Sequence, residues 1–223
     1  MSRWQEVDIT CPGCGSTGRF VIWESVNNML SPEAAQKLID GSLFLYECPN
    51  CGEKNQVHYA CLYHDMEHGA MVQLVSDTEE SVEKAFETYD MVIDNDLAKD
   101  IGFDSGYRHR IVTDINALRE KASILRDELD DRAVELMKLV VLAKNAGNGQ
   151  IPSDARAYYV CLDDDSGLVL EFVSDEGAVS ASVAREMYES LAEFVRDREP
   201  EDRGLRFIDQ QWAYEFLSER EPD

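Results

Sequence analysis

Cys11-Pro12-Gly13-Cys14-Gly15 and Cys48-Pro49-Asn50-Cys51-Gly52 are the two segments that decide how the N-terminal half of the chain folds. Each segment reads Cys-Pro-x-Cys-Gly, and a two-residue spacer lets one tight turn present two sulfur atoms to the same metal ion. Proline presets φ in such a turn, while glycine permits a left-handed backbone that brings amide groups close to the sulfurs. We therefore expect Cys11, Cys14, Cys48 and Cys51 to bind one metal ion together.

The expected metal is zinc, because four soft thiolates in a tetrahedral arrangement are typical of structural zinc sites. A closed shell of four thiolates leaves no coordination position for water or substrate, so such a site is a poor catalyst. Iron held as in rubredoxin, disulfides and redox chemistry remain alternatives. The two lone cysteines, Cys61 and Cys161, lie inside apolar runs and are expected to be small core residues.

The spacing of apolar residues predicts strands and one helix around the cysteine pairs. Ser31, Pro32 and Gly41 mark the start and end of that short helix. The expected strands cover residues 4–10, 17–26, 43–47, 56–63 and 70–75, with a hairpin turn at residues 64–69. The 33 residues between the two cysteine pairs contain one predicted strand, the helix and a second strand, and these elements return the chain to its start. The long spacing is therefore compatible with a ribbon.

Helical spacing takes over from Thr78, where apolar residues recur at three and four residue steps. Further helices are predicted at residues 114–126 and 131–144, and an extended segment at 107–112. A turn-rich segment, residues 145–154, has the composition of a linker. Beyond it we expect two strands joined by a tight turn at Ser166-Gly167, a helix from Ser182 to about Arg198, and a final short helix containing Trp212.

The composition is strongly acidic, since 45 Asp and Glu oppose 21 Lys and Arg and give a formal charge of −24. A nucleic-acid interface gains affinity from clusters of Lys and Arg, which this chain lacks. We expect a protein partner and no nucleic acid. The chain contains no long apolar stretch of membrane-span type and no signal peptide, so no membrane and a cytoplasmic location are expected.

Beyond the two cysteine pairs, three further segments resemble signatures of the CpXC protein family, which is named for its two Cys-Pro-x-Cys motifs. These segments are Tyr63-His64-Asp65-Met66, Leu118-Arg119-Glu120-Lys121 and Leu129-Asp130-Asp131-Arg132. The resemblance covers about residues 1–144. It supports the metal site and implies no reaction, because the family is functionally uncharacterised.

Two other groups of residues are candidates for chemistry. His64 and His68 lie four residues apart beside Asp65, but in a hairpin turn this spacing does not align them as ligands. Capping of the hairpin, or pairing with Arg108 or Arg110, is the structural alternative. The acidic residues of segment 127–131, beside Arg126 and Arg132, are interpreted as complementing a helix N-terminus rather than as an acid and base pair.

The sequence thus predicts an α+β fold: a zinc-ribbon-like N-terminal region with an inserted helix and β-hairpin, then helices and a small C-terminal α+β unit. The expected division is a CpXC-like domain at 1–144 (ribbon 1–76, helical part 77–144), a linker at 145–154 and a C-terminal region at 155–223. The leading functional hypothesis is a non-enzymatic protein-interaction module with structural zinc. The alternatives are an enzyme of unknown reaction near His64, Asp65, Arg108 and Arg110, and a nucleic-acid-binding ribbon. Oligomeric state stays open.

Overall fold

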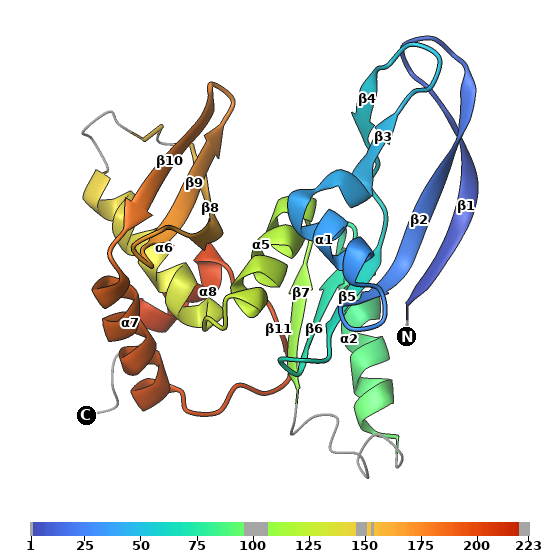
Figure 1. The fold of residues 1–223 in the computed structure, drawn as a ribbon. Helices are drawn as coiled ribbons and strands as arrows, with labels where there is room; N and C mark the ends of the chain where they lie inside the picture. Colours follow the sequence, from blue (N-terminus) through green and yellow to red (C-terminus); the bar gives the residue numbers. More distant parts are fainter. Residues whose placement is uncertain (1, 96–106, 146–150, 153, 219–223) are drawn as a thin grey trace. The chain divides into compact units, whose positions relative to one another are not determined.

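The computed structural model describes residues 2–95, 107–145, 151–152 and 154–218, and Figure 1 shows their arrangement. It contains helices and several sheets, so the predicted α+β class is confirmed. The chain divides into two compact units, Met1–Ala122 and Ser123–Asp223. Within the described residues, no helix combines the length and the apolar character needed to cross a bilayer.

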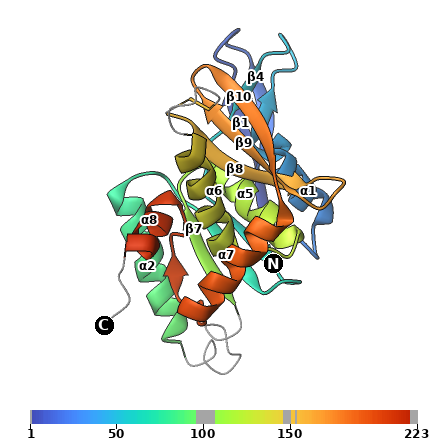
Figure 2. The ribbon, with the colours of Figure 1, turned by 90° about the vertical axis from the view of Figure 1, so that its left-hand side faces the viewer.

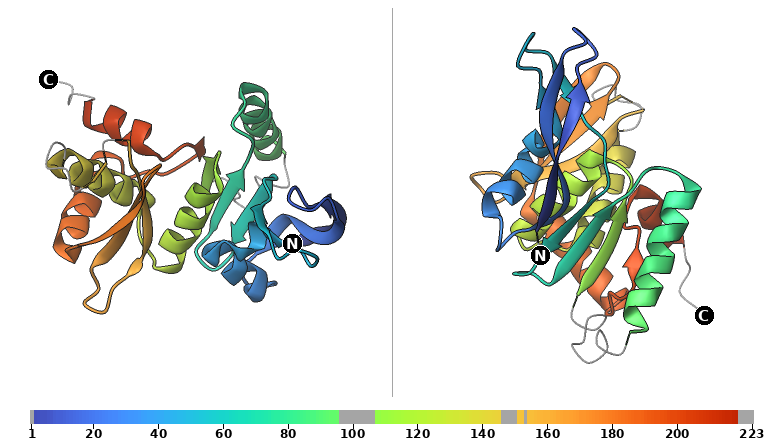
Figure 3. Two further views of the ribbon diagram at one scale, coloured as in Figure 1. Left: turned by 90° about the horizontal axis from the view of Figure 1, so that it is seen from above. Right: turned by 90° about the vertical axis from the view of Figure 1, so that its right-hand side faces the viewer.

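Two β-hairpins form the zinc-ribbon-like region of the first unit. Their strands are β1 (Arg3–Thr10), β2 (Thr17–Asn27), β3 (Leu45–Glu47) and β4 (Lys54–Gln56). Both hairpins are antiparallel, and one cysteine pair lies in the turn of each. Both turns point to the same end of the unit, which is the upper end in Figure 1 and in the right panel of Figure 3.

The second half of β2 joins the ribbon to the main sheet of this unit. Three more strands complete that sheet: β5 (Cys61–Asp65), β6 (Ala70–Leu74) and β7 (Arg108–Val112). Within the unit the strand order is β1-β2-β5-β6-β7, with parallel pairing of β2 to β5 and of β6 to β7. The β5–β6 pair is the predicted hairpin.

Helices lie on both sides of this sheet. The helix α1 (Pro32–Asp40) and the helix α2 (Glu79–Ile93) lie on opposite sides of β5, β6 and β7, as Figures 1 and 3 show. Gly41 ends α1 in the left-handed conformation, at φ 85°. Thr78 caps α2, because its side chain accepts a hydrogen bond from the Ser81 backbone N–H. Both boundaries follow the sequence signals.

The second unit packs helices against a three-stranded antiparallel sheet, whose strands are labelled β8, β9 and β10 in Figure 2. The strands are β8 (Arg156–Leu162), β9 (Leu168–Ser174) and β10 (Gly177–Val183), in the order β10-β9-β8. The helices are α6 (Asp131–Asn145), α7 (Arg185–Arg198) and α8 (Gln210–Ser218). Buried side chains of β8, β9, α6 and α7 share one hydrophobic core, in which Leu168, Leu170 and Phe172 are fully buried. The boundary between the units falls inside α5 (Ile115–Arg126), and the two-residue strand β11 (Leu205–Arg206) precedes α8.

Two predicted strands of the first unit differ from the structure. The apolar run at 56–63 is not one strand, since β4 ends at Gln56 and β5 begins at Cys61. Between them the Val57 N–H donates to the Phe44 carbonyl, 2.8 Å away, as the chain passes from the ribbon to the main sheet. The strand predicted at 43–47 begins only at Leu45, because a 3-10 turn, η1 (Ser42–Phe44), follows α1.

Two further boundaries are corrected. His64 and Asp65 belong to β5 rather than to the turn, which therefore covers only residues 66–69. In the second unit a third strand, β10, was missed, and the predicted helix start at Ser182 is wrong because α7 begins at Arg185. Segment 177–183 consists of Gly, Ala, Ser and Val, and the small residues hide its strand character.

The predicted division into 1–144, 145–154 and 155–223 stays a prediction. Residues 146–150 and 153 of the expected linker lie outside the described residues. Residues 94–106 are rich in Asp and Gly and are expected to form a loop, and most of them, from residue 96 onward, also lie outside the described residues.

Candidate metal centre

The two cysteine turns have the same backbone hydrogen bonds. In the first turn the Cys11 N–H donates to the Ser16 carbonyl and the Gly15 N–H donates to the Cys11 carbonyl, both at 2.9 Å. In the second turn the Cys48 and Gly52 N–H groups make the equivalent bonds, at 2.9 and 2.8 Å. Gly15 and Gly52 have φ values of 71° and 74°, the left-handed backbone that the sequence predicts.

The four sulfur atoms of Cys11, Cys14, Cys48 and Cys51 all lie within 4.8 Å of one another. The Cys11 and Cys51 sulfurs are 3.7 Å apart, as are those of Cys14 and Cys48. Tetrahedral zinc with Zn–S bonds of about 2.3 Å requires sulfurs about 3.8 Å apart, whereas a disulfide requires about 2.05 Å. The four cysteines could therefore hold one metal ion together, and they do not form disulfides.

Hydrogen-bond donors surround two of the sulfurs. The Ser16 hydroxyl lies 3.0 Å from the Cys14 sulfur and 3.4 Å from the Cys48 sulfur, and the Asn50 amide donates to Cys14 at 3.4 Å. Ser16 and the backbone N–H groups of Cys51 and Asn50 lower the pKa of Cys48 to about 5. Hydrogen bonds from Ser16 and Asn50 lower the pKa of Cys14 as well. Donors of this kind favour the thiolate, which is the form that binds metal.

Cys51 differs from these two thiols. A backbone hydrogen bond from Glu53 lowers its pKa, but hydrogen bonds with the Cys14 sulfur, burial and the other sulfurs outweigh that effect and raise the pKa to about 12. The proximity of the other sulfurs therefore favours the protonated form of Cys51. A divalent cation would replace such shared protons, which explains why metal binding by thiols releases protons.

A buried tyrosine lies against the cysteine cluster. Tyr46 packs with Cys11 and Cys48 and meets the Phe20 ring edge-on, with centroids 6.2 Å apart. Its hydroxyl is buried and has no hydrogen-bond partner among the described residues. Burial raises the pKa of Tyr46, and the nearby Cys48 sulfur raises it further. An unsatisfied donor beside a thiol is the arrangement expected where a metal-bound thiolate would accept the hydrogen bond.

The lone cysteines are positioned differently. Cys61 is 2 % exposed in β5, and burial raises the pKa of its thiol to about 12, so it is an inert core residue as predicted. Cys161 is partly buried in β8. Among the described residues, the four paired cysteines are the only group of three or more His, Cys, Asp or Glu side chains that could hold a metal ion.

His64, the first residue of the alternative site, has both imidazole nitrogens engaged. The Asn27 amide is oriented by the Met29 and Leu30 N–H groups, which donate to its oxygen, so its nitrogen must donate to His64 Nδ1, at 3.2 Å. His64 Nε2 then carries the proton and donates to the Tyr107 hydroxyl, also at 3.2 Å. Burial lowers the pKa of His64 and favours this neutral form. Both imidazole nitrogens of His64 are thus engaged by side chains of the described residues.

Asp65 is 1 % exposed, and its contacts come from the turn after β2 and from the β5–β6 turn. Its carboxylate accepts hydrogen bonds from the Asn28 amide at 2.7 Å and from the His68 N–H at 3.0 Å, and His68 Nδ1 lies 3.0 Å from the second oxygen. Asp65 therefore caps the β5–β6 turn, as one of the predicted alternatives has it. His64 and Asp65 are consecutive strand residues, so their side chains point to opposite faces of the sheet.

The arginines of the alternative site lie two strands away from Asp65. Asp65 pairs with Ala70 of β6, and Ala70 pairs with Arg108 of β7. Two strand spacings separate their backbones by about 9.6 Å. Arg110 is 3 % exposed and donates to the His109 carbonyl at 3.1 Å. His64 is in register with Met71 and His109, so its side chain lies on the opposite face of the sheet from those of Asp65, Arg108 and Arg110.

The other two family-like segments have structural contacts. Arg119 donates from Nε to the Ile39 carbonyl at 3.0 Å and from a terminal nitrogen to the Asp40 carbonyl at 3.4 Å, so it caps the C-terminus of α1. Asp130 accepts from the Arg132 N–H at 3.0 Å and forms a bidentate pair with its guanidinium. Asp130 therefore caps α6, in agreement with the predicted helix junction.

Asp127, the remaining acid of that junction, is also paired. It forms a bidentate pair with Arg126 and accepts a 2.6 Å hydrogen bond from the Tyr159 hydroxyl. Burial alone would raise the pKa of Asp127, but the hydrogen bonds from Arg126 and Tyr159 outweigh it and hold the pKa below its ordinary value. A carboxylate held ionised in this way has no proton to donate as an acid.

Sequence reasoning missed the residues that surround the cysteines. Ser16 directly follows the first Cys-Pro-x-Cys-Gly segment and could have been found by extending the motif one residue. Asn50 occupies the variable position of the second motif, and only the facing turn reveals its contact. Tyr46 lies in an ordinary strand pattern, and Asn27 is 37 residues from its partner His64 in the sequence. No sequence signal marks either contact.

Comparison with known proteins gives one match. No curated protein and no solved structure matches the chain. The family model described as CpXC protein matches residues 9–138, which is 130 of the 223 residues and includes all four clustered cysteines, the β5–β6 hairpin and the α1-capping Arg119. On that match the chain belongs to the CpXC protein family.

Proposed function

We propose that Cys11, Cys14, Cys48 and Cys51 hold one structural zinc ion, and that the protein is a non-enzymatic protein-interaction module. The observation that carries the zinc assignment is the sulfur geometry, with two separations of 3.7 Å where tetrahedral zinc requires about 3.8 Å. Zinc would supply a fixed tetrahedral centre that joins the β1–β2 turn to the β3–β4 turn.

The structural assignment of the metal follows from its ligands. Four cysteines would fill all four positions of a tetrahedral ion, so no position is left for water or substrate. Ser16 and Asn50 donate hydrogen bonds to sulfur, which reduces the charge on the thiolates and makes them less reactive. Both features favour a site that holds the ribbon together.

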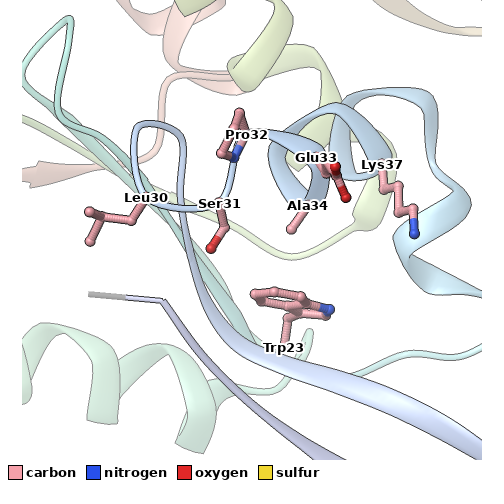
Figure 4. Close-up of a pocket in the computed structure, with 7 residues that line it drawn as sticks. All are labelled: Trp23, Leu30, Ser31, Pro32, Glu33, Ala34 and Lys37. Carbon is pink, nitrogen blue, oxygen red and sulfur yellow. The ribbon is translucent and has the colours of Figure 1, made fainter.

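The interaction role rests on the surface of the first unit. Trp4, Met29 and Leu30 are 57, 62 and 63 % exposed. Trp4 is the cross-strand partner of Trp23, which lines a pocket together with Leu30 (Figure 4). Contiguous patches of exposed apolar side chains often mark surfaces that bind other proteins. The engagement of His64 and Asp65 in structural contacts supports a binding role over the enzyme alternative.

A protein rather than a nucleic acid is the expected partner. The formal charge of −24 repels phosphate backbones, and neutralising phosphates requires Lys and Arg clusters. The basic residues of the ribbon are scattered, and Arg3 and Arg19 already pair with Glu24 and Glu6. We therefore propose that the negative charge of this chain favours a partner protein with a basic surface.

X-ray absorption at the zinc edge tests the metal assignment. The expected spectrum shows four sulfur neighbours at about 2.3 Å and no oxygen or nitrogen. A shell containing oxygen would contradict the closed structural site.

For the interaction role, the whole protein and its zinc-stripped form are used to capture partners from the native cell extract. If both forms capture the same set of partners, the proposal of a zinc-dependent interaction module is contradicted.

A further inference from the structure

The strand β10 forms one edge of the sheet in the second unit. Figure 1 shows it beside β9, with which it pairs over residues 177–183 without a bulge. Among the described residues, no strand pairs with its other edge. In an antiparallel strand every second residue directs its N–H and C=O away from the one neighbour, so this edge presents donors and acceptors to a further strand.

Other edge strands of the protein are protected against such pairing. Charged side chains and bulges are the usual means of protection. The edge strand β1 has both, since it contains Arg3, Glu6 and Asp8 and its register shifts at its start. The strand β8, at the opposite end of the sheet that contains β10, has a register shift at Val160. In contrast, β10 contains no charged residue, no proline and no bulge.

The order of residues in β10 is self-complementary. Segment 179–183 is Val-Ser-Ala-Ser-Val, which reads the same in both directions. When two copies of this segment pair in antiparallel orientation about Ala181, each Val179 lies opposite a Val183 and each Ser180 lies opposite a Ser182. Ala181 lies opposite itself at the twofold axis. Every position therefore meets a side chain of its own kind, and no like charges are opposed.

The exposure of Val179 also favours this pairing. Val183 is 7 % exposed and belongs to the hydrophobic core of the unit, and Ala181 packs against that core. Alternate residues of a strand share a face, so Val179 points to the same face, yet it is 46 % exposed. Pairing about Ala181 would place Val179 beside Val183 of a second copy, with Cβ atoms about 5 Å apart, and would cover it.

The serines on the other face favour the same register. The Ser182 hydroxyl donates to the Asp163 carboxylate, so its oxygen can accept a hydrogen bond from Ser180 of a second copy. A register centred on Ser180 would instead place Ser182 opposite Ala178 and Val183 opposite Gly177. That register would lose both the serine and the valine contacts.

We infer that two copies of this chain pair through β10, antiparallel about Ala181, and join their sheets into one continuous sheet. The self-complementary segment selects a second copy as the strand that occupies this edge. The inference goes beyond the proposed interaction role, and it does not require the zinc ion. A dimer would carry two copies of each binding surface, which strengthens binding to a partner that has two sites.

Cysteine substitution tests the register directly. In the proposed pairing the two Ala181 Cα atoms are about 4.5–5.5 Å apart, which a disulfide can bridge. Two Ser180 residues are diagonal neighbours about 7–8 Å apart, which is too far. Mild oxidation of full-length, zinc-loaded Ala181→Cys should therefore give at least about tenfold more covalent dimer than Ser180→Cys or the natural protein. Equal amounts of dimer in Ala181→Cys and Ser180→Cys would overturn the inference.

Sedimentation equilibrium measures the association without a cross-link. We expect a reversible dimer of the zinc-loaded protein that is stronger at about 500 mM than at about 50 mM salt, because salt screens the repulsion between two acidic chains. Val179→Lys places a charge on the paired edge and should weaken dimerisation at least about tenfold. Val160→Lys is the matched control: it adds the same charge at a 40 % exposed valine of β8 and should dimerise as the natural protein does.

Three results of this measurement would overturn the inference. These are a monomer at millimolar concentration in high salt, equal association of the two lysine variants, and a dimer that weakens with added salt, since such a dimer would depend on ion pairs. A protein that binds zinc and captures partners but stays monomeric would contradict this inference alone.

Discussion

Tyr46 is a residue outside the four ligands that packs against the metal site. Its buried hydroxyl has no other partner among the described residues, and the Cys48 sulfur lies beside it. A donor to a metal-bound thiolate would stabilise the charged sulfur and orient the ligand. Without the metal, the same hydroxyl is a buried donor with an unmet hydrogen bond, which costs stability.

Replacement Tyr46→Phe should therefore lower zinc affinity by about tenfold while the fold is kept, because loss of a partner of a metal ligand typically has this effect. Affinity is measured by competition with a chromophoric chelator. Tyr59→Phe is the control: its hydroxyl donates to the Leu43 carbonyl at 3.2 Å, so this change should affect stability and leave zinc affinity unaltered. Equal zinc affinity in Tyr46→Phe and the natural protein would show that the hydroxyl does not reach the ligand.

Two glycines near the cluster should respond differently to alanine. A Cβ on Gly13 would lie 1.5 Å from a Glu53 carboxylate oxygen, whereas a Cβ on Gly18 would lie 2.3 Å from the Tyr46 hydroxyl. The Glu53 carboxylate is the exposed end of a flexible side chain and can move away, but buried Tyr46 cannot.

We expect Gly18→Ala to cost about 2 kcal/mol and Gly13→Ala less than about 0.5 kcal/mol in the free energy of unfolding. Urea unfolding of the zinc-loaded variants measures both values. A larger loss in Gly13→Ala than in Gly18→Ala would mean that the shorter contact, rather than the mobility of the neighbour, decides the cost.

At the scale of elements, α1 is fixed at its C-terminus by a residue about 80 positions away in the sequence. Arg119 of α5 bonds the Ile39 and Asp40 carbonyls, and Gly41 beside it has a left-handed backbone. The last carbonyls of a helix have no partner within the helix, so a cationic side chain there satisfies them and complements the helix dipole.

Arg119→Ala should therefore destabilise the first unit by about 2 kcal/mol, since hydrogen bonds to charged groups contribute that order of energy. Arg3→Ala is the control, because Arg3 is an exposed arginine whose ion pair with Glu24 should contribute about 0.5 kcal/mol or less. Chemical unfolding of the two variants gives the comparison. Equal small losses would show that solvent replaces Arg119 as the cap without cost.

Much of the element pattern could be predicted from the sequence, because it follows from local chemistry. The boundaries of α1 follow from Pro32 and Gly41 and the start of α2 from Thr78, although the Ser31 side chain makes no capping hydrogen bond, and the β5–β6 hairpin follows from its apolar runs. The errors lie where tertiary contacts decide. Segment 56–63 is divided between two sheets, and the spacing of its apolar residues does not indicate where the division falls. The residues of β10 are small and do not indicate a strand, which forms because β10 pairs with β9.

The candidate site shows the same limit. The metal-binding role of the four cysteines could be predicted because the motif Cys-Pro-x-Cys-Gly occurs twice, and its proline and glycine fix the backbone of each turn. Asn50 approaches Cys14 only because the second turn folds against the first, 36 residues away. The neutral state of His64 likewise depends on Asn27 and Tyr107, which come from distant segments.

At the scale of the whole molecule, the acidic charge should exclude nucleic acids. We expect no binding of mixed-sequence duplex or single-stranded oligonucleotides by fluorescence anisotropy at about 50 mM salt, where electrostatic attraction is near its strongest. Micromolar binding that weakens steeply with added salt would contradict the proposal and favour the nucleic-acid-binding ribbon. Binding without salt dependence would instead indicate base stacking, for which Trp4 and Tyr214 are exposed candidates.

The central claim is that one zinc ion joins the two cysteine turns, and elemental analysis of protein purified without added metal tests it most directly. The account predicts about one equivalent of zinc and no iron per chain, with most of the zinc lost in Cys48→Ser. Cys61→Ser, which changes a buried cysteine outside the cluster, should retain the zinc. Less than about half an equivalent of zinc, iron in its place, or full zinc content in Cys48→Ser would contradict the account.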